Sequence, residues 1–188
     1  MKILKSIILI IFILLPLKLH ALIEVDITRG NLNPLPIAVS ALYSDKETTE
    51  NLKKEIKIDQ IGDEISKVIE NNLKATGLFN PLEKKAFLQK PDVAHLKPRF
   101  EDWSLIKAQA LITGKVEFKD DKVRVEFRLW DVLAAREMLA LAFTTVPNNW
   151  RRIGHIISDK IYERLTGEKG YFDTRIIYVS EKGPKTQR

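Results

Sequence analysis

The sequence has few of the cysteine and histidine side chains that most often act as nucleophiles, general bases or transition-metal ligands. Cysteine is absent, which excludes thiolate nucleophiles, disulfides and cysteine-ligated metal centres. The three histidines, His20, His95 and His155, are widely separated, and none belongs to a His-Glu-x-x-His motif. The sequence also lacks a Gly-x-Ser-x-Gly elbow and a glycine-rich phosphate loop. It therefore predicts a non-enzymatic protein with no catalytic residues, no metal site and no cofactor.

The remaining candidates for chemistry have structural interpretations. Asp120 and Asp121 are paired carboxylates, but they fall in a short polar connection, where solvated turn residues explain them better than acid–base catalysis. His155 lies within a helical pattern, and a packing or capping role is favoured over metal ligation. The three tryptophans are expected to complete a core rather than to anchor a ligand; they are Trp103, Trp130 and Trp150.

The first 21 residues have the order of a secretory signal peptide. Two lysines precede an unbroken apolar run over residues 7–15, and Pro16 ends the run. A membrane span needs about 20 apolar residues, so this run is too short for one. The small residue at the end of Leu19-His20-Ala21 is suited to signal peptidase. We expect cleavage between Ala21 and Leu22, a periplasmic location, and no stable membrane insertion afterwards.

Removal of the signal peptide changes the charge balance. Three of its residues are lysines, so the formal net charge falls from +6 to +3. The other basic residues alternate with acidic ones, as in residues 47–57 and 159–169, which is typical of a solvated face and indicates no nucleic-acid partner. Clustered positive charge occurs at Arg151-Arg152 and in residues 182–188. The alternative function is a secreted basic domain that contacts an acidic polymer, such as lipopolysaccharide or nucleic acid.

The hydrophobic pattern predicts two amphipathic helices and several strands in the mature sequence. Apolar residues recur at helical spacing over residues 61–73 and 153–165, and Gly77 and Gly167 follow these stretches as helix stops. Asn148 or Asn149 is expected to cap the second helix. Strands are predicted at residues 23–27, 37–43, 78–82, 108–118, 123–130, 138–146 and 171–179, with a loop over 44–57 and one or two helical turns over 100–106.

Several stretches together resemble the N-terminal domain of the TolB proteins of the Tol-Pal envelope system. Residues 150–179, which include Leu165-Thr166-Gly167 and Thr174-Arg175-Ile176, resemble the junction between that domain's last helix and a β-propeller. Residues 73–82 resemble the family's helix-to-strand exit, and residues 36–39 its first core strand. The resemblance covers nearly all of residues 22–180. It implies an α/β fold, a mixed β-sheet with helices packed on it, like the anticodon-binding domain of some tRNA synthetases.

The resemblance implies a function in protein–protein interaction. In the family, the mature N-terminal extension is bound by the C-terminal domain of TolA, and the system supports outer-membrane invagination during cell division and outer-membrane integrity. The apolar residues Ile23, Val25 and Ile27 alternate with polar ones, and an unpaired extended strand can be added to another protein's sheet edge. Pairing of this strand within its own domain is the alternative. The residues expected to bind TolA are Leu22, Ile23, Glu24, Val25, Asp26, Ile27, Thr28 and Arg29.

Four segments follow from this interpretation. They are a signal peptide (1–21), a partner-binding extension (22–33), an α/β domain (34–168), and a linker with the remnant of a first propeller strand (169–188). The family's six-bladed propeller, which binds the lipoprotein Pal, is not recognisable in this sequence. We therefore expect a truncated or split form that binds Pal only if a propeller is supplied.

Overall fold

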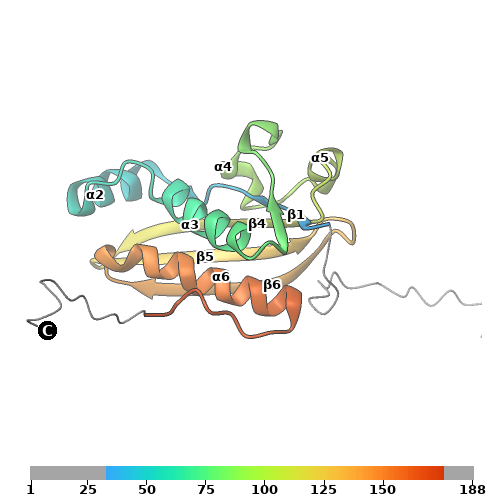
Figure 1. Cartoon of the computed structure of the whole chain (residues 1–188). Helices are drawn as coiled ribbons and strands as arrows, with labels where there is room; N and C mark the ends of the chain where they lie inside the picture. Colours follow the sequence, from blue (N-terminus) through green and yellow to red (C-terminus); the bar gives the residue numbers. More distant parts are fainter. Residues whose placement is uncertain (1–32, 176–188) are drawn as a thin grey trace, which may run out of the picture.

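A six-stranded mixed sheet organises residues 33–175, the part of the chain that the computed structural model describes (Figure 1). Its main path runs β3-β1-β4-β5-β6, and β2 pairs with β4 beside that path. The pairs formed by β1 with β3 and β4, and by β2 with β4, are parallel, whereas β4, β5 and β6 form an antiparallel meander. This confirms the predicted α/β class with a mixed sheet. The strands are β1 (Leu35–Val39), β2 (Tyr43–Ser44), β3 (Phe79–Pro81), β4 (Ala110–Lys119), β5 (Lys122–Asp131) and β6 (Arg136–Thr145).

Two long helices, α3 (Ile61–Ala75) and α6 (Trp150–Thr166), pack side by side on one face of the sheet (Figure 1). Both match the predicted amphipathic stretches. Their apolar stripes are fully buried against alternate residues of the strands, in one continuous core. The stripes comprise Ile61, Ile65, Ile69 and Leu73 of α3 and Ile153, Ile157, Ile161 and Leu165 of α6.

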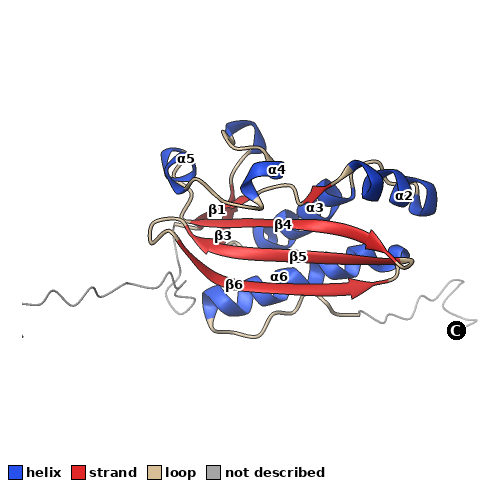
Figure 2. Ribbon diagram, turned by 180° about the vertical axis from the view of Figure 1, so that it is seen from behind, coloured by secondary structure: helices blue, strands red, loops and turns tan. Residues whose placement is uncertain are grey.

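A smaller core lies on the opposite face of β1 and β4. Ala38 and Leu111, whose neighbours along each strand point into the main core, pack here against two short helices. These helices are α4 (Pro91–Ala94) and α5 (Phe100–Leu105), the second of which contains the fully buried Trp103. Figure 2, seen from behind, shows β4, β5 and β6 in front of α3 and α6, with α4 and α5 beyond the β4 side.

The loop predicted over residues 44–57 is instead a helix, α2 (Lys46–Ile56). Asp45 is its N-cap, and its side chain accepts a hydrogen bond of 2.7 Å from the backbone N–H of Thr48. The stretch looked like a loop because it carries little apolar surface. Leu52 is fully buried, and Ile56 packs against the same core. Thr48 is also buried, and its hydroxyl oxygen accepts the backbone N–H of Phe118 on β4 at 3.3 Å, so these contacts and the cap together fix the helix to the sheet.

The single strand predicted over residues 37–43 is divided into β1 and β2. Between them, Ser40, Ala41 and Leu42 leave the strand and approach α3, where Leu42 N–H donates to the carbonyl of Gly62 at 3.3 Å. A Cβ atom at Gly62 would lie only 1.8 Å from the carbonyl oxygen of Leu42, so the absence of a side chain permits this approach.

The start of α6 and the chain after it also differ from prediction. Asn149 occupies the N-cap position but makes no side-chain capping hydrogen bond, because a short 3₁₀ turn, Pro147–Asn149, leads directly into the helix. Within the strand predicted over 171–179, residues 171–175 are not in a strand, and the rest lies outside the described residues. Across residues 33–175, none of the helices combines the length and apolar character required to cross a bilayer.

Candidate functional site

The residues predicted to bind TolA, Leu22–Arg29, and the predicted cleavage site at Ala21 lie outside the described residues. The structure does describe where this segment joins the fold. Leu35 opens β1, and its N–H donates to the carbonyl of Leu78 at 2.9 Å. Because β1 lies between β3 and β4, the strand that follows this segment in the sequence is an internal strand of the sheet, next to the edge strand β3.

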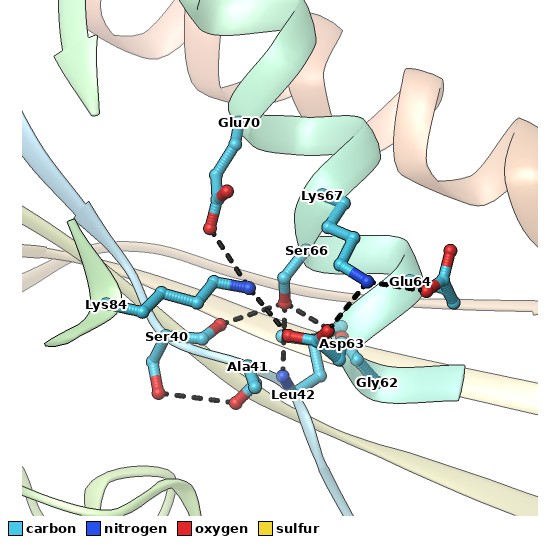
Figure 3. Close-up of polar contacts among 10 residues, drawn as sticks. All are labelled: Ser40, Ala41, Leu42, Gly62, Asp63, Glu64, Ser66, Lys67, Glu70 and Lys84. Carbon is cyan, nitrogen blue, oxygen red and sulfur yellow. Dashed lines mark hydrogen bonds and ion pairs between the residues drawn. The ribbon is translucent and has the colours of Figure 1, made fainter. Parts of the chain in front are cut away.

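A cluster of acidic and basic side chains lies along α3 between Asp63 and Glu70 (Figure 3). Lys84, from the 3₁₀ turn Lys84–Ala86, reaches α3 and places its Nζ atom 2.7 Å from Oδ1 of Asp63 and 3.1 Å from Oε1 of Glu70. Lys67 lies 3.1 Å from the other oxygen of Asp63 and 2.7 Å from Glu64. The cluster joins two segments that are far apart in the sequence.

The pKa shifts in this cluster follow from burial and pairing. Burial alone would raise the pKa of Asp63, but hydrogen bonds from Lys84 and Lys67 together outweigh it and hold the pKa below its usual value. Glu70 is the opposite case, because burial raises its pKa above the usual value despite the opposing charge of Lys84. Each ammonium group is paired with carboxylates, which is the arrangement of a structural ion pair rather than of an acid–base catalyst.

Ser66, a fully buried residue of α3, lies beside this cluster (Figure 3). Its hydroxyl oxygen lies 2.9 Å from the carbonyl of Ser40 and 2.8 Å from that of Gly62, and it accepts the N–H of Leu42 at 3.2 Å. These partners are backbone groups, whereas a nucleophilic serine needs a neighbouring base. Ser66 therefore fixes the β1–β2 connection to α3.

His155 and the aspartate pair have the structural roles that the sequence predicts. His155 lies between α3 and α6, where its Nδ1 atom is 2.9 Å from the amide nitrogen of Asn72. Asp120 and Asp121 are the two central residues of the β4–β5 turn, and both have positive φ angles of 52° and 56°, as a type I′ hairpin turn requires. Within residues 33–175, no group of three or more histidine, cysteine, aspartate or glutamate side chains could hold a metal ion.

A cavity of about 190 Å³ lies between α4 and the charged face of β4 and β5. His95 forms one wall and stacks on Tyr43, with ring centroids 4.5 Å apart. Lys115 and Glu126 belong to the floor, and their charged groups lie 3.7 Å apart. The polar groups of this cavity are thus partly satisfied by one another, and their charges do not select a ligand of one sign.

Interleaved charges also occupy the rest of this sheet face. Lys115 pairs with Glu117 at 2.7 Å, and Arg124 pairs with Glu126 at 2.8 Å. The hydrogen bond from Arg124 lowers the pKa of Glu126. Positive and negative groups therefore neutralise one another along the strands, which is unlike the clustered positive charge of a polyanion-binding surface.

The arginine pair that could favour an acidic polymer is engaged within the domain. The guanidinium of Arg151 lies over the ring of Trp150, 4.9 Å from its centroid. Arg152 donates from Nε and Nη2 to the carboxylate of Asp173, each at 3.0 Å. Sequence reasoning missed this contact and the Lys84 cluster, because both join residues about 20 positions apart that share no local pattern.

Comparison with known proteins identifies the family to which this arrangement of strands and helices belongs. Residues 23–138 match the TolB amino-terminal domain. Over 179 residues the chain is 74% identical to the Tol-Pal system protein TolB of Pelagibacter ubique (strain HTCC1062), and the match covers 95% of this chain and 40% of that protein. The chain therefore spans less than half of that relative's length.

A solved structure agrees with this relationship at the level of the fold. TolB from Acinetobacter baumannii superimposes with a TM-score of 0.59 at 22% sequence identity, over 75% of this chain and 30% of that one. At this identity the likeness concerns the arrangement of strands and helices alone. The family match and the 74% identical relative go further, and on their basis the chain belongs to the family of TolB amino-terminal domains.

Proposed function

We propose that this chain is a non-enzymatic, periplasmic component of the Tol-Pal system, and that its mature N-terminal segment, residues 22–33, binds the C-terminal domain of TolA. In this role it supports outer-membrane invagination during division and outer-membrane integrity. The observation that carries the proposal is the 74% identity to a Tol-Pal system protein over nearly the whole chain. The family match begins at Ile23, so the proposed binding segment belongs to the region shared within the family.

The proposed binding mode is addition of a strand to the edge of a sheet in TolA. Alternating apolar residues at positions 23, 25 and 27 suit this mode, because backbone hydrogen bonds supply affinity and alternate side chains supply specificity. The segment enters the fold at β1, whose two edges are already occupied by β3 and β4. It is therefore not needed to complete the hydrogen bonds of the strand to which it is attached.

The test compares residues 22–188 with a variant that lacks residues 22–33, titrated with the isolated TolA C-terminal domain by calorimetry. We expect the deletion to abolish binding while the melting temperature stays nearly unchanged. A Val25→Pro variant removes one backbone donor and should weaken binding sharply. Val25→Ile keeps the donor, the β propensity and an apolar side chain, and serves as its matched control.

Two outcomes would contradict the proposal. Unfolding of the domain on deletion would assign the segment to its own sheet. Unchanged TolA binding after deletion would place the binding site elsewhere in the chain.

Binding to Pal is proposed to need more than these residues. The resemblance assigns that contact to the propeller, and this chain spans only 40% of the length of its TolB relative. We expect residues 22–188 alone not to retain Pal in a co-purification experiment, and retention of Pal would contradict this.

A further inference from the structure

The chain that follows α6 turns back along the same helix (Figure 1). Gly167 ends α6 in the left-handed conformation, with φ of 76°, and its N–H donates to the carbonyl of Glu163 at 2.9 Å. Phe172 and Asp173 then lie beside Asp159, about two helical turns before the end of α6. The segment Gly170–Asp173 is therefore in contact with the helix from which it has just emerged.

Asp159 holds this segment through its backbone. One carboxylate oxygen accepts the N–H of Phe172 at 2.6 Å, and the other accepts the N–H of Asp173 at 3.0 Å. Hydrogen bonds to an ionised carboxylate are shorter and stronger than those between neutral groups. Two adjacent amides bound by one carboxylate fix the position and the direction of the chain.

A second contact lies two turns earlier on the same side of α6. Arg152 makes two parallel hydrogen bonds to the carboxylate of Asp173, and its neighbour Arg151 points to Trp150 instead. Residues 152 and 159 are seven positions apart, so both lie on one face of the helix. The segment is thus bound along about two turns of α6 rather than at a single point.

Aromatic packing and a glycine also bring the segment Gly170–Asp173 into close contact with α6. Tyr162, which is buried, contacts the rings of Tyr171 and Phe172 in edge-on geometry, with centroids 5.6 and 6.0 Å apart. Gly170 passes so close to the helix that a Cβ atom there would lie 2.4 Å from the Cα atom of Asp159. Any side chain at position 170 would therefore displace the segment from the helix.

We infer that Gly170–Asp173 is a docked strap, meaning an extended segment that forms part of this domain and holds the outgoing chain against α6. Asp173 is thereby held against the first turn of α6 through Arg152. This inference goes beyond the proposed binding of TolA and does not depend on it, because the strap lies at the other end of the chain.

The test measures the strap directly in residues 22–188, by amide hydrogen exchange and ¹⁵N relaxation. In the wild type, the amides of Phe172 and Asp173 should exchange at least about tenfold more slowly than in an unstructured peptide. Their order parameters should match those of α6, near 0.85, a value typical of rigid backbone. Asp159→Ala should remove the protection of both amides and lower the order parameters below about 0.6.

Glu163→Ala is the matched control, because Glu163 lies one turn later on α6 and its side chain pairs with Lys160 at 2.9 Å. Glu163→Ala should leave the exchange rates and order parameters of the strap amides unchanged. Gly170→Ala should release the strap while the amides within α6 stay protected. Unprotected strap amides in the wild type would overturn the inference, as would an equal increase in their exchange rates in Asp159→Ala and Glu163→Ala. If Asp159→Ala also disturbs α6, the wild-type order parameters and the exchange rates in Gly170→Ala decide between the outcomes.

Discussion

Gly154 of α6 lies so close to Val68 of α3 that a Cβ atom at position 154 would come within 2.8 Å of the Val68 Cγ1 atom. Real Cβ atoms do not approach other heavy atoms this closely, so the two helices can pack at this distance only because residue 154 lacks a side chain. His155, the next residue, faces Asn72 of α3. The contact between Gly154 and Val68 therefore sets the separation of the two helices that cover the sheet.

Substitution of Gly154 tests this contact. Alanine favours a helix over glycine by about 1 kcal/mol, but overpacking of a buried contact costs about 1–3 kcal/mol. We expect Gly154→Ala to lower the free energy of unfolding by about 1–2 kcal/mol in urea denaturation. In a Val68→Gly background both close contacts, with Cγ1 and with Cβ at 2.9 Å, are absent, so the same change should become neutral or stabilising. An alanine at 154 that stabilises the wild-type domain would show that the helices are not in close contact.

A charged side chain in the buried apolar stripe of α6 should destabilise the domain more than Gly154→Ala does. Ile157 is fully buried in the main core, so Ile157→Asp places an unpaired carboxylate there and should cost about 3–5 kcal/mol. Lys160→Asp introduces the same group on the exposed side of the helix, where the cost should stay near or below about 1 kcal/mol. Equal melting temperatures for Ile157→Asp and the wild type would mean that a different face of α6 is buried.

The sequence predicted the elements whose burial repeats regularly. The stripes of α3 and α6 and the alternation in β5 each involve four or more apolar residues at constant spacing, and they match the structure. Helix α2 is not predicted because it has only two apolar residues, Leu52 and Ile56, although Asp45 three residues before Thr48 is a recognisable capping signal. Local pattern is therefore informative only where several residues repeat the same signal.

Contacts between distant segments could not be predicted in the same way. The break between β1 and β2 depends on the match between Leu42 and Gly62, and the ion pairs of Lys84 depend on where a 3₁₀ turn meets α3. No spacing rule connects these positions. The proposed TolA-binding strand is different again, because its prediction rests on alternation at positions 23–27 and on the family resemblance, and it stays a prediction.

Lys84 should contribute to stability through its two carboxylate partners. Lys84→Met leaves the partly buried Glu70 without its ammonium partner and Asp63 paired with Lys67 alone among the described residues, and should lower the free energy of unfolding by about 1–2 kcal/mol. Burial raises the pKa of Glu70 and Lys84 opposes that rise, so the variant should raise the pKa of Glu70 further. Carbon-detected NMR titration measures this directly.

Lys85→Met is the matched control for that experiment. Lys85 is the adjacent residue, and its ammonium pairs with Glu83 in an exposed position. The control should leave both stability and the pKa of Glu70 unchanged. A similar loss of stability in the two variants would mean that the net charge of the domain, and not the specific pairing of Lys84, determines the effect.

Acid should weaken the contact between the strap and α6. The hydrogen bonds and charge of Arg152 hold the pKa of Asp173 below its usual value of 3.8, and His155 and Arg175 add smaller effects in the same direction. The contact is therefore fully present above pH 3.8 and is lost as the pH falls through the lowered pKa. Arg152→Gln should return the pKa of Asp173 toward 3.8 in an NMR titration. Arg151→Gln, whose guanidinium lies over Trp150, should not.

The alternation in residues 23–28 predicts that only one side of the proposed TolA-binding strand supplies specificity. In strand addition, side chains at alternate positions enter pockets of the partner while those between them face away. Serine in place of the three apolar residues, Ile23, Val25 and Ile27, should weaken binding of the TolA C-terminal domain at least about tenfold, because buried apolar side chains contribute about 1 kcal/mol or more each. Alanine in place of the three polar residues, Glu24, Asp26 and Thr28, should change affinity less than about threefold at moderate salt, where exposed charges are screened. Calorimetry with both triple variants gives the comparison, and equal losses from the two sets would be inconsistent with addition of an extended strand.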